Sequence, residues 1–374
     1  MKLKILGYLY QNLFRKILFL FDPEFIHDTI TYLGKLIGST KPGQQITENI
    51  FFYKSNKLGQ DISGIHFANP IGLSAGFDKD ANLVNIIPFV GFGFITVGTV
   101  TYQPYEGNPK PRLYRLKKSQ ALVVNYGLKN IGANKIVEKL KNYKKPEKFI
   151  LGISVGKTNC PETSETKRGA EDYLNCLKVL NDNKIGDFYE INISCPNTFG
   201  GEPFTTPDKL ELLLSRLTTL NISKPIFLKM PINLAWEEFK NLLDVTITYR
   251  INGVTIGNLN KNRKDPNIKD EIPEYIKGSI SGKPTYKLSN DLIRETYKYS
   301  GDKLKIIGVG GVFSPEDAYE KIKLGASLVG LITGMIYQGP QLIGQINDGL
   351  EKELNKNNLA NLAQAIGSEL HFKA

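Results

Sequence analysis

A cluster of polar side chains in residues 190–200 holds the groups in this sequence that are best suited to chemistry. Asn192, Cys195 and Asn197 supply two amides and one thiol within six residues. A deprotonated thiol can act as a base, and amides can pair with the carbonyl and N–H groups of a small polar molecule. Pro196 ends the preceding apolar run, because it lacks an N–H and fixes its φ. Such residues are also common in ordinary turns, so a polar loop with an incidental thiol is an equally open interpretation of this stretch alone.

A repeating pattern of short β-rich runs and helical segments surrounds this cluster from residue 69 onward. The expected strands are 71–75, 94–97, 149–155, 187–193, 225–230, 253–256, 304–309 and 327–331. The expected helices include 171–180, 209–220, 236–249, 290–299 and 315–324, and residues 59–67 are expected to form a hairpin. This alternation predicts an α/β fold, a (β/α)₈ TIM barrel. An open doubly wound sheet is the alternative, but the turn at 72–76 lacks its Gly-x-Gly-x-x-Gly pattern.

The barrel predicts that functional groups gather at the carboxyl ends of its strands. Polar side chains do follow the first six expected strands: Lys79, Thr99, Ser154, Asn192, Cys195, Lys229 and Asn258. Glycines and a hydroxyl follow the last two strands, at Gly310, Gly311 and Thr333. Backbone N–H groups at glycines can approach phosphate oxygens closely, and Ser281 and Gly282 could add a further contact. The sequence therefore predicts a phosphate site beside the polar cluster.

Residues 1–40 have a different pattern from the rest of the chain. Apolar residues recur there at three- and four-residue spacings, with Lys2, Lys4, Arg15 and Lys16 among them. This predicts amphipathic helices that lie on the cytoplasmic side of the cell membrane as a peripheral anchor. A helical hairpin packed on its own domain is the alternative. The expected division is a helical extension at 1–40, the barrel at 41–352 and a tail at 353–374.

The composition of the 374 residues is that of a globular protein, with 41% apolar and 23% charged residues. The net charge of +11 is spread thinly, without a basic block, so no nucleic-acid partner is expected. Three scattered cysteines form neither a disulfide framework nor a metal-ligand spacing, and no metal is expected. We expect a reducing compartment.

Several separate motifs resemble those of dihydroorotate dehydrogenases. They are Asn-Pro-Ile-Gly-Leu-Ser-Ala-Gly-Phe-Asp-Lys-Asp from residue 69, Lys-Pro-Arg-Leu-Tyr-Arg from 110, the polar cluster itself, Ser-Gly-Lys-Pro from 281 and Ile-Ile-Gly-Val-Gly-Gly from 306. Phe-Asp-Pro-Glu-Phe-Ile-His from 21 is similar to the N-terminal extension of the membrane-associated, quinone-using class. The resemblance covers nearly the whole chain.

This resemblance implies an FMN-dependent oxidation of dihydroorotate to orotate in pyrimidine synthesis, with a quinone as final acceptor. Cys195 would remove the C5 proton while hydride leaves C6 for the flavin. The implied FMN contacts are Ala75, Gly76, Lys79, Thr99, Ser154, Asn192, Lys229, Gly257, Ser281, Gly282, Gly310, Gly311 and Thr333. The implied substrate contacts are Lys79, Asn125, Gly127, Leu128, Asn192, Asn197, Thr198 and Asn258, and His27 and Arg115 would border the quinone path. A free thiol has a pKa of ~8.5, so the pKa of Cys195 must be lowered for it to act as a base at neutral pH. Nearby cations are expected to lower it.

Some positions depart from the family pattern. At the position of Cys195 the quinone-using class has serine, and a cysteine there is similar to the soluble class of the family. The family's substrate-binding asparagine falls on Val124, and Asn125 restores the amide only if the loop shifts by one residue. Ser154, Leu259 and Ile332 also replace family residues. Two alternatives therefore stand beside a dihydroorotate dehydrogenase: an FMN oxidoreductase with a diverged substrate, and a flavin-binding homologue without catalysis.

Overall fold

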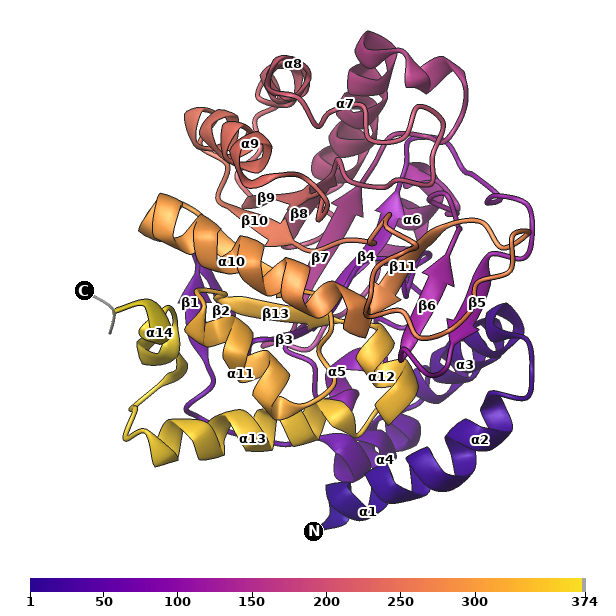
Figure 1. Cartoon of the computed structure of the whole chain (residues 1–374), viewed down its shortest axis with the longest axis vertical. Coiled ribbons are helices and arrows are strands. Elements are labelled where there is room, and N and C mark those ends of the chain that lie inside the picture. Colours follow the sequence, from indigo (N-terminus) through magenta and orange to yellow (C-terminus); the bar gives the residue numbers. More distant parts are fainter. Residues whose placement is uncertain (372–374) are drawn as a thin grey trace.

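Eight parallel strands form a closed barrel at the centre of the molecule (Figure 1). The structure is a computed structural model that describes residues 1–371. In order around the barrel the strands are β3 (Ile71–Leu73), β4 (Phe94–Val100), β7 (Ile150–Val155), β8 (Phe188–Asn192), β9 (Ile226–Met230), β10 (Gly253–Ile256), β12 (Lys305–Val309) and β13 (Leu328–Leu331). The predicted (β/α)₈ barrel and its eight strands are confirmed.

The barrel strands are buried on both faces, which explains why their sequences are apolar runs and not alternating patterns. Aromatic side chains fill the amino-terminal end of the barrel, where Phe94 packs edge-on against Phe188 and Phe188 against Phe227. The predicted hairpin is confirmed as β1 (Gln60–Ile62) and β2 (Ile65–Phe67), and it covers this end through a contact of Phe67 with Phe94. The opposite end of the barrel is left for the site.

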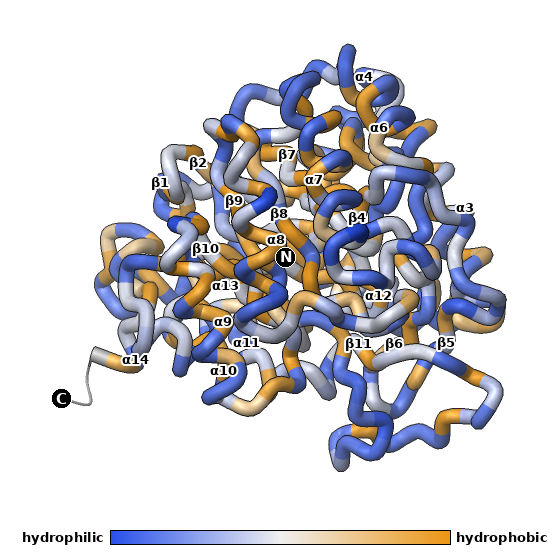
Figure 2. Tube along the Cα trace, turned by 90° about the horizontal axis from the view of Figure 1, so that it is seen from above, coloured by the Kyte–Doolittle hydropathy of each residue, from blue (hydrophilic) through white to orange (hydrophobic). Residues whose placement is uncertain are grey.

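Helices surround the barrel, and the five predicted segments are confirmed within a few residues at each end. The predicted segments are α7 (Thr166–Asp182), α8 (Pro207–Leu217), α9 (Trp236–Thr248), α10 (Tyr286–Ser300) and α11 (Pro315–Lys323). The other helices are α5 (Ile87–Val90), α6 (Ala133–Leu140), α12 (Thr333–Gln338), α13 (Leu342–Lys356) and α14 (Ser368–His371). Short 3₁₀ turns occur at Glu162–Ser164, Lys283–Thr285, Gly301–Lys303 and Leu362–Ala365. Apolar chain follows the inner strands, and hydrophilic chain follows much of the outer surface (Figure 2).

A second, three-stranded sheet beside the barrel was not predicted. It consists of β5 (Leu113–Leu116), β6 (Ala121–Val124) and β11 (Ser279–Gly282), all antiparallel. Strand β6 lies between the other two, so residues more than 150 positions apart in sequence form one sheet. Val124 pairs with Leu113 on one side and Ser279 on the other. This sheet brings Ser281 and Gly282 toward the barrel mouth.

The N-terminal extension folds as helices, of which the first lies against α12 and α13 (Figure 1). A continuous helix comprises α1 (Lys2–Leu9), a π-helical turn (Tyr10–Phe14) and α2 (Arg15–Leu18), followed by α3 (Pro23–Gly38) and α4 (Lys41–Phe51). Asp22 caps α3 through the N–H of Phe25 at 2.9 Å, as its place before Pro23 predicts. The hydroxyl of Tyr10 donates to the carbonyl of Ile336 at 2.8 Å, which fixes the extension on α12.

The extension leaves much apolar surface uncovered. Sixteen of the nineteen exposed large apolar side chains among the described residues lie in residues 1–46, among them Leu13, Phe14, Phe25 and Leu36. No described helix combines the length and apolarity needed to cross a membrane. The domain division stays a prediction; α13 runs without a break across residue 352, and residues 372–374 of the expected tail lie outside the described residues.

Candidate active site

One cavity of about 630 Å³ joins the N-terminal helices to the carboxyl end of the barrel. Its outer part is lined by apolar side chains of the helices, such as Phe14, Leu18 and Ile30. Most of the predicted site residues line it: His27, Ala75, Gly76, Lys79, Thr99, Arg115, Gly127, Leu128, Asn192, Cys195, Asn197, Lys229, Asn258, Ser281 and Thr333. Residues from ten separate segments therefore meet in one space, and many of them follow barrel strands, as the barrel geometry predicts.

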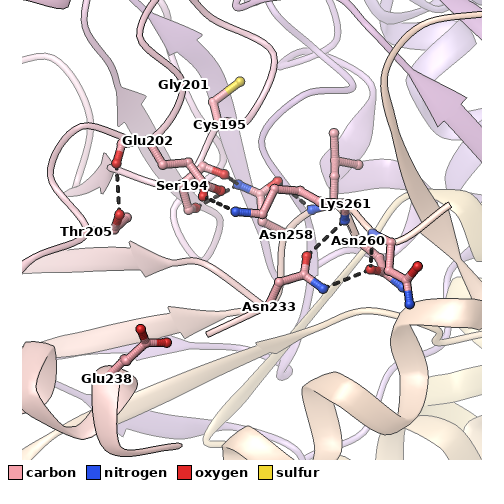
Figure 3. Close-up of polar contacts among 12 residues, drawn as sticks. Ser194, Cys195, Gly201, Glu202, Thr205, Asn233, Glu238, Asn258, Asn260 and Lys261 are labelled. Atoms are coloured by element: carbon pink, nitrogen blue, oxygen red, sulfur yellow. Dashed lines mark hydrogen bonds and ion pairs between the residues drawn. The ribbon is translucent and has the colours of Figure 1, made fainter. Parts of the chain in front are cut away.

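Cys195 follows β8, and its thiol lines the cavity. Burial raises its pKa to about 11, although a hydrogen bond from the backbone of Asn197 and the positive charges of Lys229 and Lys157 act to lower it. The prediction that nearby cations would lower this pKa is therefore wrong, because loss of solvation outweighs them. Figure 3 shows the Cys195 sulfur directed away from the hydrogen-bonded group around Asn258.

A chain of hydroxyl and amide groups crosses the barrel mouth. The amide of Asn192 donates to the hydroxyl of Thr99 at 2.8 Å, and that hydroxyl lies 3.0 Å from the hydroxyl of Ser154. Ser154 is fully buried and contacts the cavity only through Thr99. The hydroxyl of Tyr173 donates to the carbonyl of Asn192 at 2.6 Å. These bonds fix the amide of Asn192 in the cavity wall.

Lys229 and Glu190 form a buried pair that sequence reasoning missed. The ammonium of Lys229 lies 3.7 Å from one carboxylate oxygen of Glu190, and Thr255 donates to the other at 2.8 Å. Strand register places Asn192 beside Lys229, so Glu190 lies one layer deeper in the same barrel interior. The alternation Phe188, Glu190, Asn192 along β8 is the signal that could have revealed this.

Lys79 occupies an unusual environment at the middle of the cavity. Its ammonium donates to Nε2 of His27 at 3.1 Å and lies 3.8 Å from the ring centre of Tyr126. Burial lowers the pKa of Lys79 to about 8, and burial together with the charge of Lys79 lowers that of His27 to about 3. Neutral His27, stacked on Phe77 at 4.9 Å, is therefore the acceptor. Lys79 thus links the extension to the barrel.

The predicted phosphate residues surround one corner of the barrel mouth. The hydroxyls of Ser281 and Thr333 lie 2.9 Å apart. Gly282, Gly310 and Gly311 have φ values of +93°, +119° and +70°, a backbone region that disfavours other residues. None of the three glycines lines the main cavity; Gly311 borders a second cavity of about 500 Å³. Gly257 approaches the backbone of Val309 too closely for a side chain, which gives it a packing role.

The amide of Asn125 does not line the cavity. Its oxygen accepts a hydrogen bond from Asn108 at 3.0 Å, while Val124 faces the cavity in its place. Asn108 also donates to the carbonyl of Asn197 at 2.9 Å, so both asparagines are held by it. The amide of Asn197 donates to the carbonyl of Val124 at 2.9 Å. The substrate role of Asn125 stays a prediction that this arrangement does not favour.

The loops after β8 and β10 fasten to each other around the site (Figure 3). The amide of Asn258 donates to the hydroxyl and carbonyl of Ser194, each at 2.7 Å. Lys261 pairs with Glu202 at 2.6 Å across the same two loops. Thr198 uses its hydroxyl within its own loop, donating to the carbonyl of Gly201 at 2.8 Å, and does not line the cavity.

The comparisons with known proteins agree with this geometry. A family model described as dihydroorotate dehydrogenase matches residues 57–354. A curated relative from Nostoc sp., named dihydroorotate dehydrogenase (quinone), is 36% identical over 367 residues, which cover 94% of this chain and 95% of the relative. A relative of the same name from Corynebacterium glutamicum is 32% identical over 359 residues, covering 96% of this chain and 95% of the relative. A crystal structure of DHODH in complex with ferulenol from Eimeria tenella matches with a TM-score of 0.83 and 27% identity, over 93% of this chain and 96% of that chain. The chain belongs to the dihydroorotate dehydrogenase family.

Proposed function

We propose that this protein oxidises dihydroorotate to orotate in pyrimidine biosynthesis and passes the electrons to a quinone. The observation that carries the proposal is the single cavity that joins the polar barrel mouth, with Cys195 and Lys79, to an apolar region among the N-terminal helices. A polar substrate needs polar surroundings and an apolar acceptor needs apolar ones, and both must lie close to the same redox group. The relatives named for a quinone-dependent enzyme support the same assignment.

The residues present fit FMN as the cofactor of this family. Three glycines with positive φ and the hydroxyl pair of Ser281 and Thr333 can surround a phosphate. Asn192 and Lys229 can bind polar edges of the flavin ring in the barrel mouth. When bound, FMN accepts a hydride from the substrate and delivers two electrons to the quinone. The protein residues supply the binding, the orientation and the proton transfer.

On the substrate side, Cys195 is the proposed base that takes the C5 proton of dihydroorotate. Its thiol is protonated at neutral pH because of burial, so it must lose its proton before or as the substrate reacts. Asn197 and Asn258 line the cavity and are held by hydrogen bonds to Val124 and Ser194. Lys79 supplies a positive charge that can stabilise the negative charge of the reduced cofactor.

On the acceptor side, we propose that the quinone enters between the N-terminal helices and passes His27 and Arg115. Arg115 lies 4.5 Å from the ring centre of Phe19 and donates to the carbonyl of Phe21 at 2.6 Å. We propose that the exposed apolar side chains of residues 1–46 dock on the cytoplasmic face of the cell membrane, where quinones are dissolved. The extension would then act as a separate unit for acceptor access.

The function is tested by mixing the FMN-loaded protein anaerobically with dihydroorotate while following the flavin absorbance. We expect loss of the yellow colour, followed by its return when a quinone is added. Persistent colour with FMN still bound would refute oxidation of dihydroorotate. Reduction without reoxidation by quinone would refute the proposed acceptor. Binding of the protein to anionic lipid vesicles, compared with a variant lacking residues 1–40, tests the membrane proposal.

One observation favours a second candidate, an FMN oxidoreductase that acts on another substrate. Val124 faces the cavity, and Asn125 is bonded to Asn108, so one amide that would pair with the pyrimidine ring is lost from the site. An unpaired polar group of a bound ligand costs about 1–3 kcal/mol. If dihydroorotate leaves the flavin oxidised but another small reductant bleaches it, this second function holds.

A further inference from the structure

Lys321 is a fully buried amine for which the proposed reaction has no use. It projects from α11 with an exposed fraction of 0%. Its ammonium donates to the hydroxyl of Ser289 at 3.0 Å and to the amide oxygen of Asn290 at 2.7 Å, both neutral acceptors. It also lies 5.3 Å from the ring centre of Tyr286. A buried cation bonded only to neutral groups is costly, so its presence needs a reason.

The three partners of Lys321 lie in the first two turns of α10, directly behind the predicted phosphate loops. A Cβ atom at Gly310 would lie 3.3 Å from Cβ of Ser289 and 2.8 Å from the hydroxyl of Thr285. A Cβ at Gly311 would lie 2.5 Å from Cβ of Tyr286. The glycine loop therefore packs on the same helical turns that Lys321 contacts.

Hydrogen bonds connect the Lys321 amine to the loop of Gly310 through one intervening side chain. Ser289 accepts from Lys321 and donates to the carbonyl of Val309, the residue before Gly310. On the other side of the phosphate corner, Thr285 donates to the carbonyl of Gly282 at 2.8 Å. The amino-terminal end of α10 already carries a partial positive charge. When its amine is protonated, Lys321 adds a positive charge beneath this helix end, and its side chain is fully buried.

We propose that Lys321 is an electrostatic positioning residue for the FMN phosphate, which it attracts from behind the loops of Gly282, Gly310 and Gly311 without touching it. This inference rests on the proposed function, because it assumes that FMN is the ligand. The phosphate corner offers hydroxyl and backbone donors, and Lys118, Lys269 and Lys283 line the cavity beside Gly311. Lys321 adds a positive charge from the buried side. Its partner Ser289 holds the ammonium toward the loops.

The charges around Lys321 agree with this role. Burial lowers its pKa to about 7, and the carboxylates of Asp317 and Glu320 on its own helix oppose the decrease. Both carboxylates are engaged elsewhere: Asp317 accepts from the N–H of Phe313 at 2.8 Å, and Glu320 pairs with Lys323 at 2.8 Å. Tyr286 is the titratable group that faces the amine from α10. A phosphate dianion would favour the charged form of Lys321.

The test compares FMN with riboflavin, which lacks the phosphate, in full-length protein stripped of flavin. Lys321→Met should weaken FMN binding about tenfold or more, as a unit charge interacting across a partly polar interior predicts, and change riboflavin binding less than about twofold. Flavin fluorescence gives both dissociation constants. Lys323→Met on the same helix is the matched control, since Lys323 pairs with Glu320 and Glu369 at the surface, and it should leave both constants unchanged. Equal changes for the two flavins, or no change for FMN, would overturn the inference.

A second measurement needs no variant and applies even if Lys321→Met does not fold. At pH 8 the amine is mostly neutral in the flavin-free protein and the FMN phosphate, with a second pKa of about 6, is already a dianion. Calorimetry in two buffers of different ionisation enthalpy should show uptake of close to one proton with FMN and none with riboflavin. Equal uptake with both flavins would contradict the inference. A wild-type protein that binds neither flavin would instead refute the proposed function.

Discussion

The high pKa of Cys195 predicts a distinctive pH dependence for flavin reduction. With a pKa of about 11, the thiol must give up its proton at a cost of about 5.4 kcal/mol at pH 7, since 4 units at 1.36 kcal/mol each separate the two values. Only ~1 molecule in 10⁴ then holds a thiolate, and raising the pH from 7 to 8 should speed flavin reduction about tenfold. Above pH 8 the increase should stop. The pKa of Lys79 is lowered to about 8 by burial, so above pH 8 the fraction of charged Lys79 falls about tenfold per pH unit. This fall cancels the rise of about tenfold in the fraction of Cys195 thiolate.

The assay is anaerobic stopped-flow mixing of FMN-loaded protein with saturating dihydroorotate, read as flavin absorbance in a single turnover. We expect a slope of one in the logarithm of the rate below pH 8 and a plateau above it. A rate that is flat between pH 6 and 8 would refute Cys195 as a base with a raised pKa. A rate that keeps rising tenfold per unit to pH 10 would show that the charge of Lys79 is not required.

Three further changes have defined outcomes. Cys195→Ala should slow flavin reduction by orders of magnitude while the absorbance of bound FMN persists, and near-normal reduction would identify another base. Deletion of residues 1–40 should abolish quinone turnover yet keep flavin reduction by dihydroorotate; surviving quinone turnover would remove the proposed role of the helices. Thr255→Val should lower the free energy of unfolding in urea by about 1–3 kcal/mol, because it removes the hydrogen bond of the buried Glu190 carboxylate, and unchanged stability would contradict that role.

The barrel could be predicted because each of its strands carries its own local signal. A buried parallel strand is an apolar run bounded by turn residues, and parallel connections place every carboxyl end at the same rim. The sheet of β5, β6 and β11 has no such signal. Strand β11 (Ser279–Gly282) contains two serines and a glycine and follows Gly278, and its partner strand lies more than 150 residues away. Helix α4 begins with Lys-Pro-Gly, which in sequence is typical of a turn.

The residues of the site could be predicted from the sequence, but their protonation states and ion pairs could not. Strand ends could be read from the sequence, and most residues chosen there line one cavity. The direction of the Cys195 pKa shift depends on how far burial exceeds the effect of two lysines, which only three-dimensional packing determines. The pairing of Lys229 with Glu190 depends in the same way on the register between β8 and β9.

The N-terminal extension is bonded to the substrate loop as well as to the proposed quinone path. Glu24 of α3, which is buried, pairs with Arg112 at 3.1 Å, and Arg112 donates to the carbonyl of Asn108, whose amide holds the loop of Asn197. Deleting residues 1–40 therefore also leaves Arg112 without its acid partner. Glu24→Gln in the full-length protein separates the two effects, because it keeps the helices and removes only the charge pair. If both proteins show the same rise in the KM for dihydroorotate, loss of the ion pair accounts for that rise. What the deletion loses beyond it comes from the quinone path and from the lost bond between His27 and Lys79.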